Sequence, residues 1–260
     1  MTRPTERFTT RVENYLRYRP GYPPEAIELL RSRCGLKPGV AVADLGSGTG
    51  ILTELLLRAG AQVAAVEPNA AMRAAAQAAL GADARFRSVD GRAEATTLAA
   101  ESIDLLVAGQ AFHWFEVESA HAEALRIVRP GGWAALLWNE RPSEATAFLA
   151  DYEALLLRHA QDYARITASR ADPVSMRRFL GESMEAATFA NQQILDFTGL
   201  KGRLLSSSYA PEPGQPQHEP MIAGLREVFY RHQHDGRIVF PYRTLVYFAQ
   251  LKPQSRGPTA

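Results

Sequence analysis

The sequence predicts an α/β fold built on a parallel, doubly wound sheet. Over the first 140 residues, short apolar segments alternate with longer stretches of helical periodicity. A glycine-rich turn directly follows the first of these apolar segments, as is common where a strand leads into a helix. Strands that alternate with helices pair in parallel through crossover connections, so these observations favour the doubly wound class.

The expected elements of this first part follow one another in regular order. Five short apolar segments are predicted strands: Val40–Leu45, Ala61–Glu67, Ala84–Asp90, Ile103–Gly109 and Trp133–Trp138. Three amphipathic or alanine-rich stretches are predicted helices: Thr49–Gly60, Asn69–Leu80 with Asn69 as N-cap, and about Val117–Val128, ended by Arg129–Gly132. Ligands of such sheets bind at the carboxyl ends of the strands, so the loops there form the candidate site.

Beyond residue 140 the pattern is less regular. A helix is expected near Ala145–Ala164, and a surface loop over Ser206–Pro220, which contains four prolines. Gly236–Leu251 is expected to be a strand, with Pro241 suggesting a sheet edge or a bulge. The last nine residues are expected to form a frayed tail.

Composition narrows the class of partners and the compartment. The 260 residues carry a formal net charge of +1, so no overall field favours nucleic acid or an anionic membrane. Cys34 is the one cysteine, which excludes an intrachain disulfide. The first ten residues lack the apolar core of a secretory signal, and no run approaches the ~18 apolar residues of a membrane span. A soluble, cytoplasmic protein is expected.

The glycine-rich turn indicates the class of ligand. Its spacing is Gly46-x-Gly48-x-Gly50, and Asp44 stands two residues before the first glycine. A dinucleotide site has the spacing G-x-G-x-x-G and holds a pyrophosphate, which an adjacent carboxylate would repel. A cation suits that carboxylate, and S-adenosylmethionine (AdoMet) carries a sulfonium and an ammonium group. The sequence therefore favours AdoMet over NAD.

Two later loops carry further polar groups for such a ligand. Glu67 ends the second predicted strand, where a carboxylate can accept both ribose hydroxyls, although a solvated acid at a strand end is the alternative. In the segment Asp90–Glu94, a carboxylate is placed to accept from the adenine amino group, and a backbone amide to meet a ring nitrogen. The aromatic segment Gly109–Phe115 follows the fourth strand and is expected to face the ligand.

The ordered series of motifs resembles the class I AdoMet-dependent methyltransferases. The segments "VADLGSGTG", "VEPNAAM", "GRAE", "AGQAFHWF" and "RIVRPGGWAALLWNER" are similar to the successive motifs of that class. More narrowly, they look like the methyltransferase type 11 group with its trans-aconitate methyltransferase-like proteins. "YLRYRPGYP" is similar to the leader of that subgroup, and the resemblance covers about residues 15–251.

The resemblance implies a specific architecture. It implies a Rossmann-like seven-stranded sheet, mostly parallel with the last strand antiparallel, and helices on both faces. It implies a single domain, divided into a helical leader (about 1–35), an AdoMet-binding core (about 36–140), a cap or substrate region with one sheet strand (about 141–235) and a closing strand (about 236–251).

The resemblance also implies cofactor contacts. Arg19, with one of Tyr15, Tyr18 or Tyr22, is expected to meet the methionine carboxylate or to close the site. The full set of expected cofactor-binding residues is Tyr18, Arg19, Asp44, Gly46, Ser47, Gly48, Glu67, Pro68, Asp90, Gly91, Ala93, Glu94 and Gln110.

The sequence indicates the methyl acceptor less clearly than the cofactor. A carboxylate acceptor needs no general base, whereas a phenol or hydroxyl gains from a histidine near the methyl group. His113 is the candidate, although a structural histidine is the commoner outcome. Trp114 is expected to line the acceptor pocket, and packing in the core is the alternative. Arg141 is a candidate for attracting an acidic substrate, and a structural role as a surface arginine is the alternative. His232 and His234 lack a third ligand cluster, so no metal site is expected.

These observations predict an AdoMet-dependent methyltransferase that acts on a carboxylate or hydroxyl oxygen of a small molecule. One alternative is a protein of the same fold that binds a ligand or catalyses a non-methylating reaction. A second is an NAD-dependent oxidoreductase, which Asp44 and the position of Gly50 disfavour. A monomer or homodimer is expected, with neither nucleic acid nor membrane as partner.

Overall fold

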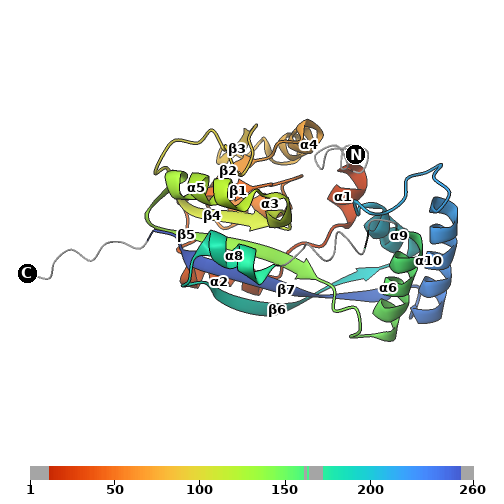
Figure 1. Ribbon diagram of the computed structural model, residues 1–260. Coiled ribbons are helices and arrows are strands. Elements are labelled where there is room, and N and C mark those ends of the chain that lie inside the picture. The colour runs from red at the N-terminus through yellow and green to blue at the C-terminus, as the bar shows by residue number, and fades with distance from the viewer. Residues whose placement is uncertain (1–11, 161–162, 164–171, 253–260) are drawn as a thin grey trace, which may run out of the picture. The chain divides into compact units, whose positions relative to one another are not determined.

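Seven strands form one sheet in the order β3-β2-β1-β4-β5-β7-β6, mostly parallel with the last strands antiparallel (Figure 1). The computed structural model describes residues 12–160, 163 and 172–252. The strands are β1 Ala41–Leu45, β2 Gln62–Val66, β3 Phe86–Val89, β4 Ile103–Gly109, β5 Val128–Glu140, β6 Glu185–Leu195 and β7 Ile238–Gln250. The predicted fold class, a Rossmann-like doubly wound sheet, is confirmed.

Helices connect the strands, and Figure 1 labels them along the chain. They are α1 Val12–Tyr18, α2 Pro24–Arg33, α3 Ile51–Arg58, α4 Ala70–Leu80, the 3₁₀ helix η3 Phe112–Trp114, α5 Val117–Ile127, α6 Ala147–His159, α8 Pro173–Leu180, α9 Phe197–Leu205 and α10 His218–His232. The predicted N-cap of α4 is confirmed, because the Asn69 side chain accepts a hydrogen bond from the Met72 amide at 3.0 Å. The first ten residues and most of the predicted tail lie outside the described residues.

The strand order places a topological switch point beside β1. The chain runs outward from β1 through β2 to β3, and then returns to place β4 on the other side of β1. Both neighbours are parallel to β1, and Asp44 pairs in register with Ala65 of β2 and Val107 of β4. The loops that leave β1 and β4 therefore diverge above adjacent strand ends, which is where open α/β sheets bind ligands.

Two details differ from what the sequence suggested. The segment Arg129–Gly132 follows the end of α5 as expected, but it also belongs to β5, which is longer than the predicted strand Trp133–Trp138. Its backbone pairs with the distant end of the chain: the Leu251 amide donates to the Gly132 carbonyl, and the Gly131 amide donates to the Lys252 carbonyl. Pro241 suggested a sheet edge or a bulge: the edge was wrong, because β7 lies between β5 and β6 and β6 is the edge strand, and the bulge stays a prediction.

The chain divides into two compact units. The core unit contains Tyr22–Trp138, Ala171–Phe189 and Leu245–Ala260, and the accessory unit contains Met1–Gly21, Asn139–Arg170 and Ala190–Thr244. The predicted division into one domain with four regions stays a prediction.

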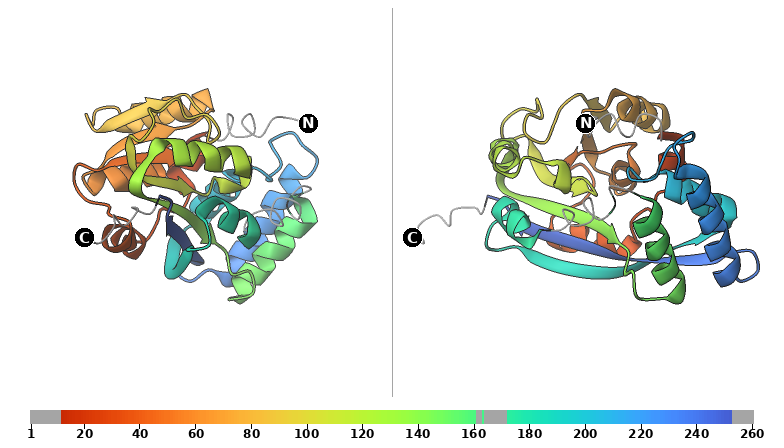
Figure 2. Two further views of the ribbon diagram at one scale, coloured as in Figure 1. Left: turned by 60° about the vertical axis from the view of Figure 1, so that its left-hand side comes forward. Right: turned by 45° about the vertical axis from the view of Figure 1, so that its right-hand side comes forward.

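In the core unit, apolar side chains cover both faces of the sheet. Ala43 and Leu45 of β1 belong to one buried cluster, together with residues of α5 and α8, and Val42 belongs to another, together with residues of α2 and α3. Successive side chains of a strand point to opposite faces, so the two clusters mark the two sides of the sheet. Figure 2 shows α5 and α8, in yellow-green and teal, as neighbours.

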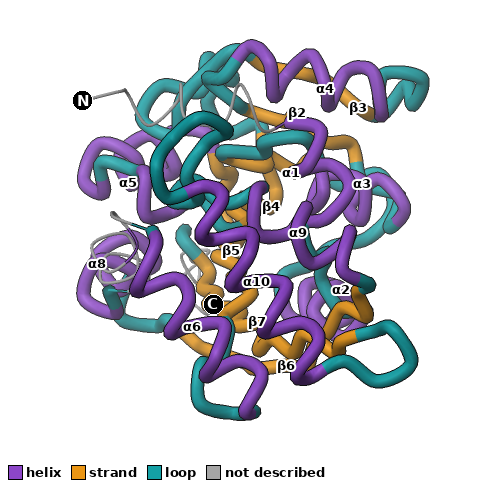
Figure 3. The backbone as a smooth tube through the Cα atoms, turned by 90° about the vertical axis from the view of Figure 1, so that its right-hand side faces the viewer, coloured by secondary structure: helices purple, strands orange, loops and turns teal. Residues whose placement is uncertain are grey.

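The accessory unit has a core of its own, rich in aromatic residues. Helices α6 and α10 lie side by side (Figure 3), and α9 packs against α10 and α1. Tyr152 of α6 and Phe240 of β7 are fully buried at its centre, with ring centroids 5.2 Å apart. Among the helices that the structure describes, none has the length and apolar character that a bilayer-spanning helix requires.

Candidate functional site

The glycine-rich turn lies at the carboxyl end of β1 and leads into α3. All three glycines have left-handed φ values, of 66° for Gly46, 57° for Gly48 and 91° for Gly50. A Cβ atom added to Gly46 would lie 2.6 Å from the Cβ of Ala111, in the loop that follows β4. Glycine is thus required there both for the turn and for the close approach of the two loops. The result is a glycine turn packed against the loop that follows β4.

Asp44 is buried beneath this turn with one carboxylate oxygen unused. Its side chain is 1% exposed, and Oδ2 accepts a hydrogen bond from Thr53 Oγ1 at 2.6 Å. In the part of the chain that the structure describes, Oδ1 and the neighbouring Thr49 Oγ1 have no hydrogen-bond partner. Burial raises the pKa of Asp44 to about 7, although the bond from Thr53 opposes this. Buried polar atoms are almost always bonded, so these two atoms point to a polar or cationic ligand.

Glu67 connects the end of β2 to the same turn. Its Oε2 accepts from the Gly48 amide at 3.0 Å, and its Oε1 accepts from the Asn69 amide at 2.8 Å. Burial raises the pKa of Glu67, and these two backbone bonds partly offset the effect. Each carboxylate oxygen has further acceptor capacity, so Glu67 can still receive two hydroxyl donors. Pro68, which follows it, is half-buried.

The carboxylates of the loop after β3 have protein partners. Arg73 bridges two segments: Nη2 pairs with Asp90 Oδ2 at 2.7 Å, and Nη1 donates to the Glu67 carbonyl at 2.8 Å. Glu94 Oε1 accepts from the Glu116 amide at 2.8 Å, next to the start of α5. Ala93 is buried in the core and Gly91 is half-buried. The expected adenine contacts of this loop stay a prediction.

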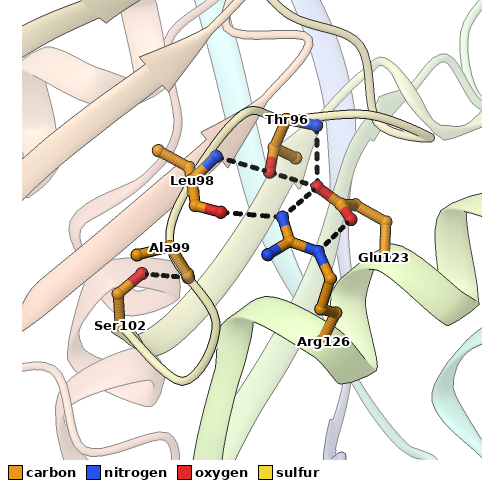
Figure 4. Close-up of polar contacts among 6 residues, drawn as sticks. All are labelled: Thr96, Leu98, Ala99, Ser102, Glu123 and Arg126. Atoms are coloured by element: carbon orange, nitrogen blue, oxygen red, sulfur yellow. Dashed lines mark hydrogen bonds and ion pairs between the residues drawn. The ribbon is translucent and has the colours of Figure 1, made fainter.

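A further network, which sequence reasoning missed, anchors the continuation of this loop to α5 (Figure 4). Glu123 accepts from the amide and the hydroxyl of Thr96, at 2.8 and 2.5 Å, and from Arg126 Nε at 2.7 Å. Arg126 Nη2 also donates to the Leu98 carbonyl at 2.7 Å. The spacing of Glu123 and Arg126 on one helix was the available signal, since residues three apart are neighbours.

The loop after β4 contains a strained residue and the aromatic candidates. Gln110 has a φ of 59°, which is uncommon for a residue with a side chain and often marks a functional loop. His113 and Trp114 lie in η3 with ring centroids 4.6 Å apart, and Trp114 is 36% exposed. A Cβ atom added to Gly109 would clash with the Tyr22 hydroxyl, so Tyr22 packs against the end of β4. Tyr22 belongs to the core unit, whereas Tyr15 and Tyr18 belong to the accessory unit.

The accessory unit holds the other predicted site residues. Arg19 Nη2 donates to the Ser206 carbonyl at 2.9 Å, and its guanidinium lies 4.7 Å from the centroid of the Tyr15 ring. The Tyr18 ring packs closely against Gly202. Arg141 is not a surface arginine, because its side chain is only 8% exposed. The structure therefore brings the core-unit residues together at the ends of β1, β2 and β4, while the roles expected of Tyr18, Arg19 and Arg141 stay predictions.

The residues of the core unit fit AdoMet by their chemistry. The Asp44 oxygen that has no partner among the described residues suits an ammonium group, Glu67 suits a ribose diol, and a turn of left-handed glycines is typical of sites where a ligand approaches the main chain. Within the described residues there is no group of three or more histidine, cysteine, aspartate or glutamate side chains suited to a metal ion.

Comparisons with known proteins agree with this reading. The family model described as "Methyltransferase domain" matches residues 43–136. An uncharacterized methyltransferase of Mycobacterium tuberculosis is 40% identical over 134 residues, which are 52% of this chain and 52% of that protein. The chain thus spans about half the length of the curated relatives it matches.

Solved structures share the fold. A protein assigned as a type II methyltransferase from Anaeromyxobacter dehalogenans superposes with a TM-score of 0.62 at 22% identity, covering 91% of this chain and 100% of that one. The phosphoethanolamine N-methyltransferase 2 of Haemonchus contortus, bound to S-adenosylhomocysteine, has a TM-score of 0.54 at 15% identity, covering 95% and 58%. The narrower likeness to the trans-aconitate methyltransferase-like group stays a prediction. Residues 43–136 thus match a methyltransferase domain, and this match, the relatives and the shared fold support a class I S-adenosylmethionine-dependent methyltransferase.

Proposed function

We propose that this chain transfers the methyl group of AdoMet to a small-molecule acceptor, at a carboxylate or hydroxyl oxygen. The observation that carries the proposal is the buried carboxylate of Asp44, which has one oxygen unpaired among the described residues beside a turn of three left-handed glycines. A buried, half-bonded carboxylate favours a cationic ligand, and NAD supplies an anionic pyrophosphate instead.

Each core-unit residue has a distinct part in holding the cofactor. Asp44 would face the ammonium group, Glu67 would accept from the ribose hydroxyls, and the backbone at Gly46 and Gly48 would line the methionine part. Ser47, Pro68, the segment Asp90–Glu94 and Gln110 are proposed as further contacts, as the family resemblance implies. When bound, AdoMet supplies a sulfonium whose methyl group is open to nucleophilic attack.

Methyl transfer to the acceptor requires few catalytic groups of the protein. In-line displacement at a methyl group is accelerated by positioning and by exclusion of water. A carboxylate attacks without losing a proton, whereas a hydroxyl must give its proton to a base, for which His113 is the candidate. Trp114, beside His113, is the proposed wall of the acceptor pocket. A cytoplasmic monomer or homodimer, without nucleic acid as partner, completes the proposal.

The test is turnover with matched variants. The full-length chain is incubated with AdoMet and a panel of carboxylic acids and phenols, and S-adenosylhomocysteine is measured by mass spectrometry. Asp44→Ala and Glu67→Ala are expected to weaken AdoMet binding about tenfold or more, because each removes hydrogen bonds to a charged group. Asp83→Ala, which alters a carboxylate outside the site, is expected to leave affinity unchanged.

Three outcomes would contradict the proposal in different ways. Tight AdoMet binding without turnover over a broad panel would favour a ligand-binding or non-methylating protein of this fold. Binding of NADH alone would favour an oxidoreductase. Unchanged affinity in both site variants would mean that the cofactor binds elsewhere.

A further inference from the structure

The accessory unit buries a group of arginine and tyrosine side chains that the cofactor site does not use. Arg141 Nη1 donates to the Tyr209 hydroxyl at 3.1 Å, and Nη2 donates to the Tyr163 hydroxyl at 2.5 Å and to Glu153 Oε2 at 3.1 Å. Glu153 is thus the carboxylate partner of this arginine. The side chain of Arg141 is only 8% exposed, so its charge is largely removed from water.

Arg203 lies in the same core without a carboxylate. It is 5% exposed, its Nε donates to the Tyr242 hydroxyl at 2.9 Å, and its Nη1 donates to Ser207 Oγ at 3.1 Å. Its guanidinium also lies 5.7 Å from the centroid of the Phe240 ring. Within the described residues, no aspartate or glutamate forms an ion pair with Arg203. Neutral hydroxyls and ring faces offset part of the desolvation of this cation and leave its charge unbalanced.

A tyrosine hydroxyl beside the two arginines also lacks a partner. Tyr152 is fully buried, and its hydroxyl forms no hydrogen bond within the part of the chain that the structure describes. The Arg141 guanidinium lies 5.3 Å from the centroid of the Tyr152 ring. Burial raises the pKa of Tyr152, and Arg141 and Arg203 only partly oppose this, so the hydroxyl keeps its proton. A buried O–H donor with no acceptor requires an explanation.

We propose that Arg141, Arg203 and Tyr152 form a binding site for the carboxylate of a small organic acid. Two guanidinium groups against the one carboxylate of Glu153 leave a net charge of +1 among these side chains, which one carboxylate neutralises. A phosphate group carries about −1.5 to −2 at neutral pH and would overcompensate it. Such an acid supplies an anionic partner for Arg203 and an acceptor for the Tyr152 hydroxyl, which has none among the described residues. The proposal rests on the proposed function for the class of acceptor and assigns the side chains that would hold its carboxylate, all of them in the accessory unit.

Direct binding tests this site. The full-length chain is titrated with the monocarboxylates acetate, propionate and benzoate, with acetamide as an uncharged control and inorganic phosphate as a competing anion, by calorimetry and thermal unfolding. At least one carboxylate is expected to bind and to raise the unfolding midpoint. Tyr152→Phe is expected to weaken that affinity about tenfold, because it removes one hydrogen bond to a charged group. Arg203→Met is expected to abolish binding.

Matched variants separate binding from folding. Tyr152→Phe should keep the unfolding midpoint of the ligand-free protein, since the Tyr152 hydroxyl forms no hydrogen bond with any residue that the structure describes. Tyr242→Phe should lower it, because the Tyr242 hydroxyl bonds to both Arg203 and Gln193. Tyr230→Phe, at a side chain that is 63% exposed, should change neither quantity.

Several results would overturn the proposal. They are the absence of binding by every carboxylate, tighter binding of phosphate than of any carboxylate, and an unchanged carboxylate affinity in Tyr152→Phe. S-adenosylhomocysteine affinity, measured in parallel, reports on the cofactor site of the core unit. Loss of carboxylate binding with that affinity intact therefore bears on the accessory-unit site alone, and loss of cofactor affinity bears on the proposed function.

Discussion

Asp44 combines a destabilising environment with a functional position. Desolvation raises its pKa from 3.8 to about 7, so the folded protein without ligand holds a proton there more readily than the unfolded chain does. The stability linked to this group is therefore fully present below about pH 4 and is lost as the pH rises through about 7. Above that range an anion remains buried with one oxygen unpaired, and a cationic ligand relieves the penalty.

This reasoning predicts that binding of S-adenosylhomocysteine depends on pH through Asp44. The ligand keeps the ammonium group of AdoMet, so it should prefer the ionised carboxylate. Its affinity should be constant above about pH 7.5 and should fall by up to about tenfold per pH unit below 7. Isothermal titration calorimetry between pH 5.5 and 8.5 measures this slope.

Asp44→Asn should bind weakly and without the slope, because the titrating group is gone. Asp83→Asn is the matched control: Asp83 is paired with Arg85, and this bond lowers its pKa, so it stays ionised over the whole range. A slope that persists in Asp44→Asn would assign the pH dependence to another group.

At the scale of elements, the loop after β3 depends on α5 for its conformation. Glu123 of α5 receives four hydrogen bonds, two from Thr96 and two from Arg126, and its side chain is 9% exposed (Figure 4). The bonds from Arg126 and Thr96 lower the pKa of Glu123 to about 2, although burial opposes this. The network thus links the loop that contains the predicted adenine contacts to a helix packed on the sheet.

We expect Glu123→Gln to destabilise the protein by about 1–3 kcal/mol at pH 7, because charge-assisted bonds are replaced by weaker ones. The folded-state pKa of Glu123 lies below its ordinary value of 4.5, so this stabilisation is present above about pH 4.5 and declines as the pH falls toward 2. Urea unfolding at pH 7 and pH 3.5 should show the difference between variant and wild type shrinking at the lower pH. Glu118→Gln, at an exposed position of the same helix, should have little effect at either pH.

The elements that could be predicted from the sequence are those whose conformation depends on neighbouring residues. The alternation of strand and helix over residues 40–128 and the cap at Asn69 depend on neighbouring residues, so the sequence sufficed for them. The extended backbone at Arg129–Gly132 depends on pairing with Leu251 and Lys252, more than a hundred residues away. Glycine and proline there indicate a turn locally, and long-range hydrogen bonds override that preference.

The same distinction applies to the candidate sites. Asp44, Gly46 and Glu67 follow their strands directly, so topology alone placed them together. The partners of Asp90 and Glu94 were not predictable, because Arg73 and the Glu116 amide come from other elements. The side chains around Arg141 and Arg203 come from α6, α9 and β7. No motif of contiguous residues predicts that they lie together.

On the scale of the whole molecule, the two units offer opposite electrostatics to their ligands. The core unit buries carboxylates, Asp44 and Glu67, and suits a ligand with a cationic group. The accessory unit buries guanidinium groups, Arg141 and Arg203, and suits an anion. The two proposed sites therefore have opposite charge preferences, which would limit binding of either proposed ligand at the wrong site.

This separation predicts two independent patterns of amide protection. Hydrogen–deuterium exchange of the full-length chain, read by mass spectrometry, should slow at Gly46–Gly50 and Glu67–Asn69 when S-adenosylhomocysteine is added, because a bound ligand suppresses local opening. A binding monocarboxylate such as acetate should instead slow exchange within α6 and α9. Asp44→Asn should reduce the first pattern and keep the second, and Tyr152→Phe should do the reverse. If both ligands protected the same segments, one shared site would replace the two proposed, and the opposite charges buried in the two units would need another explanation.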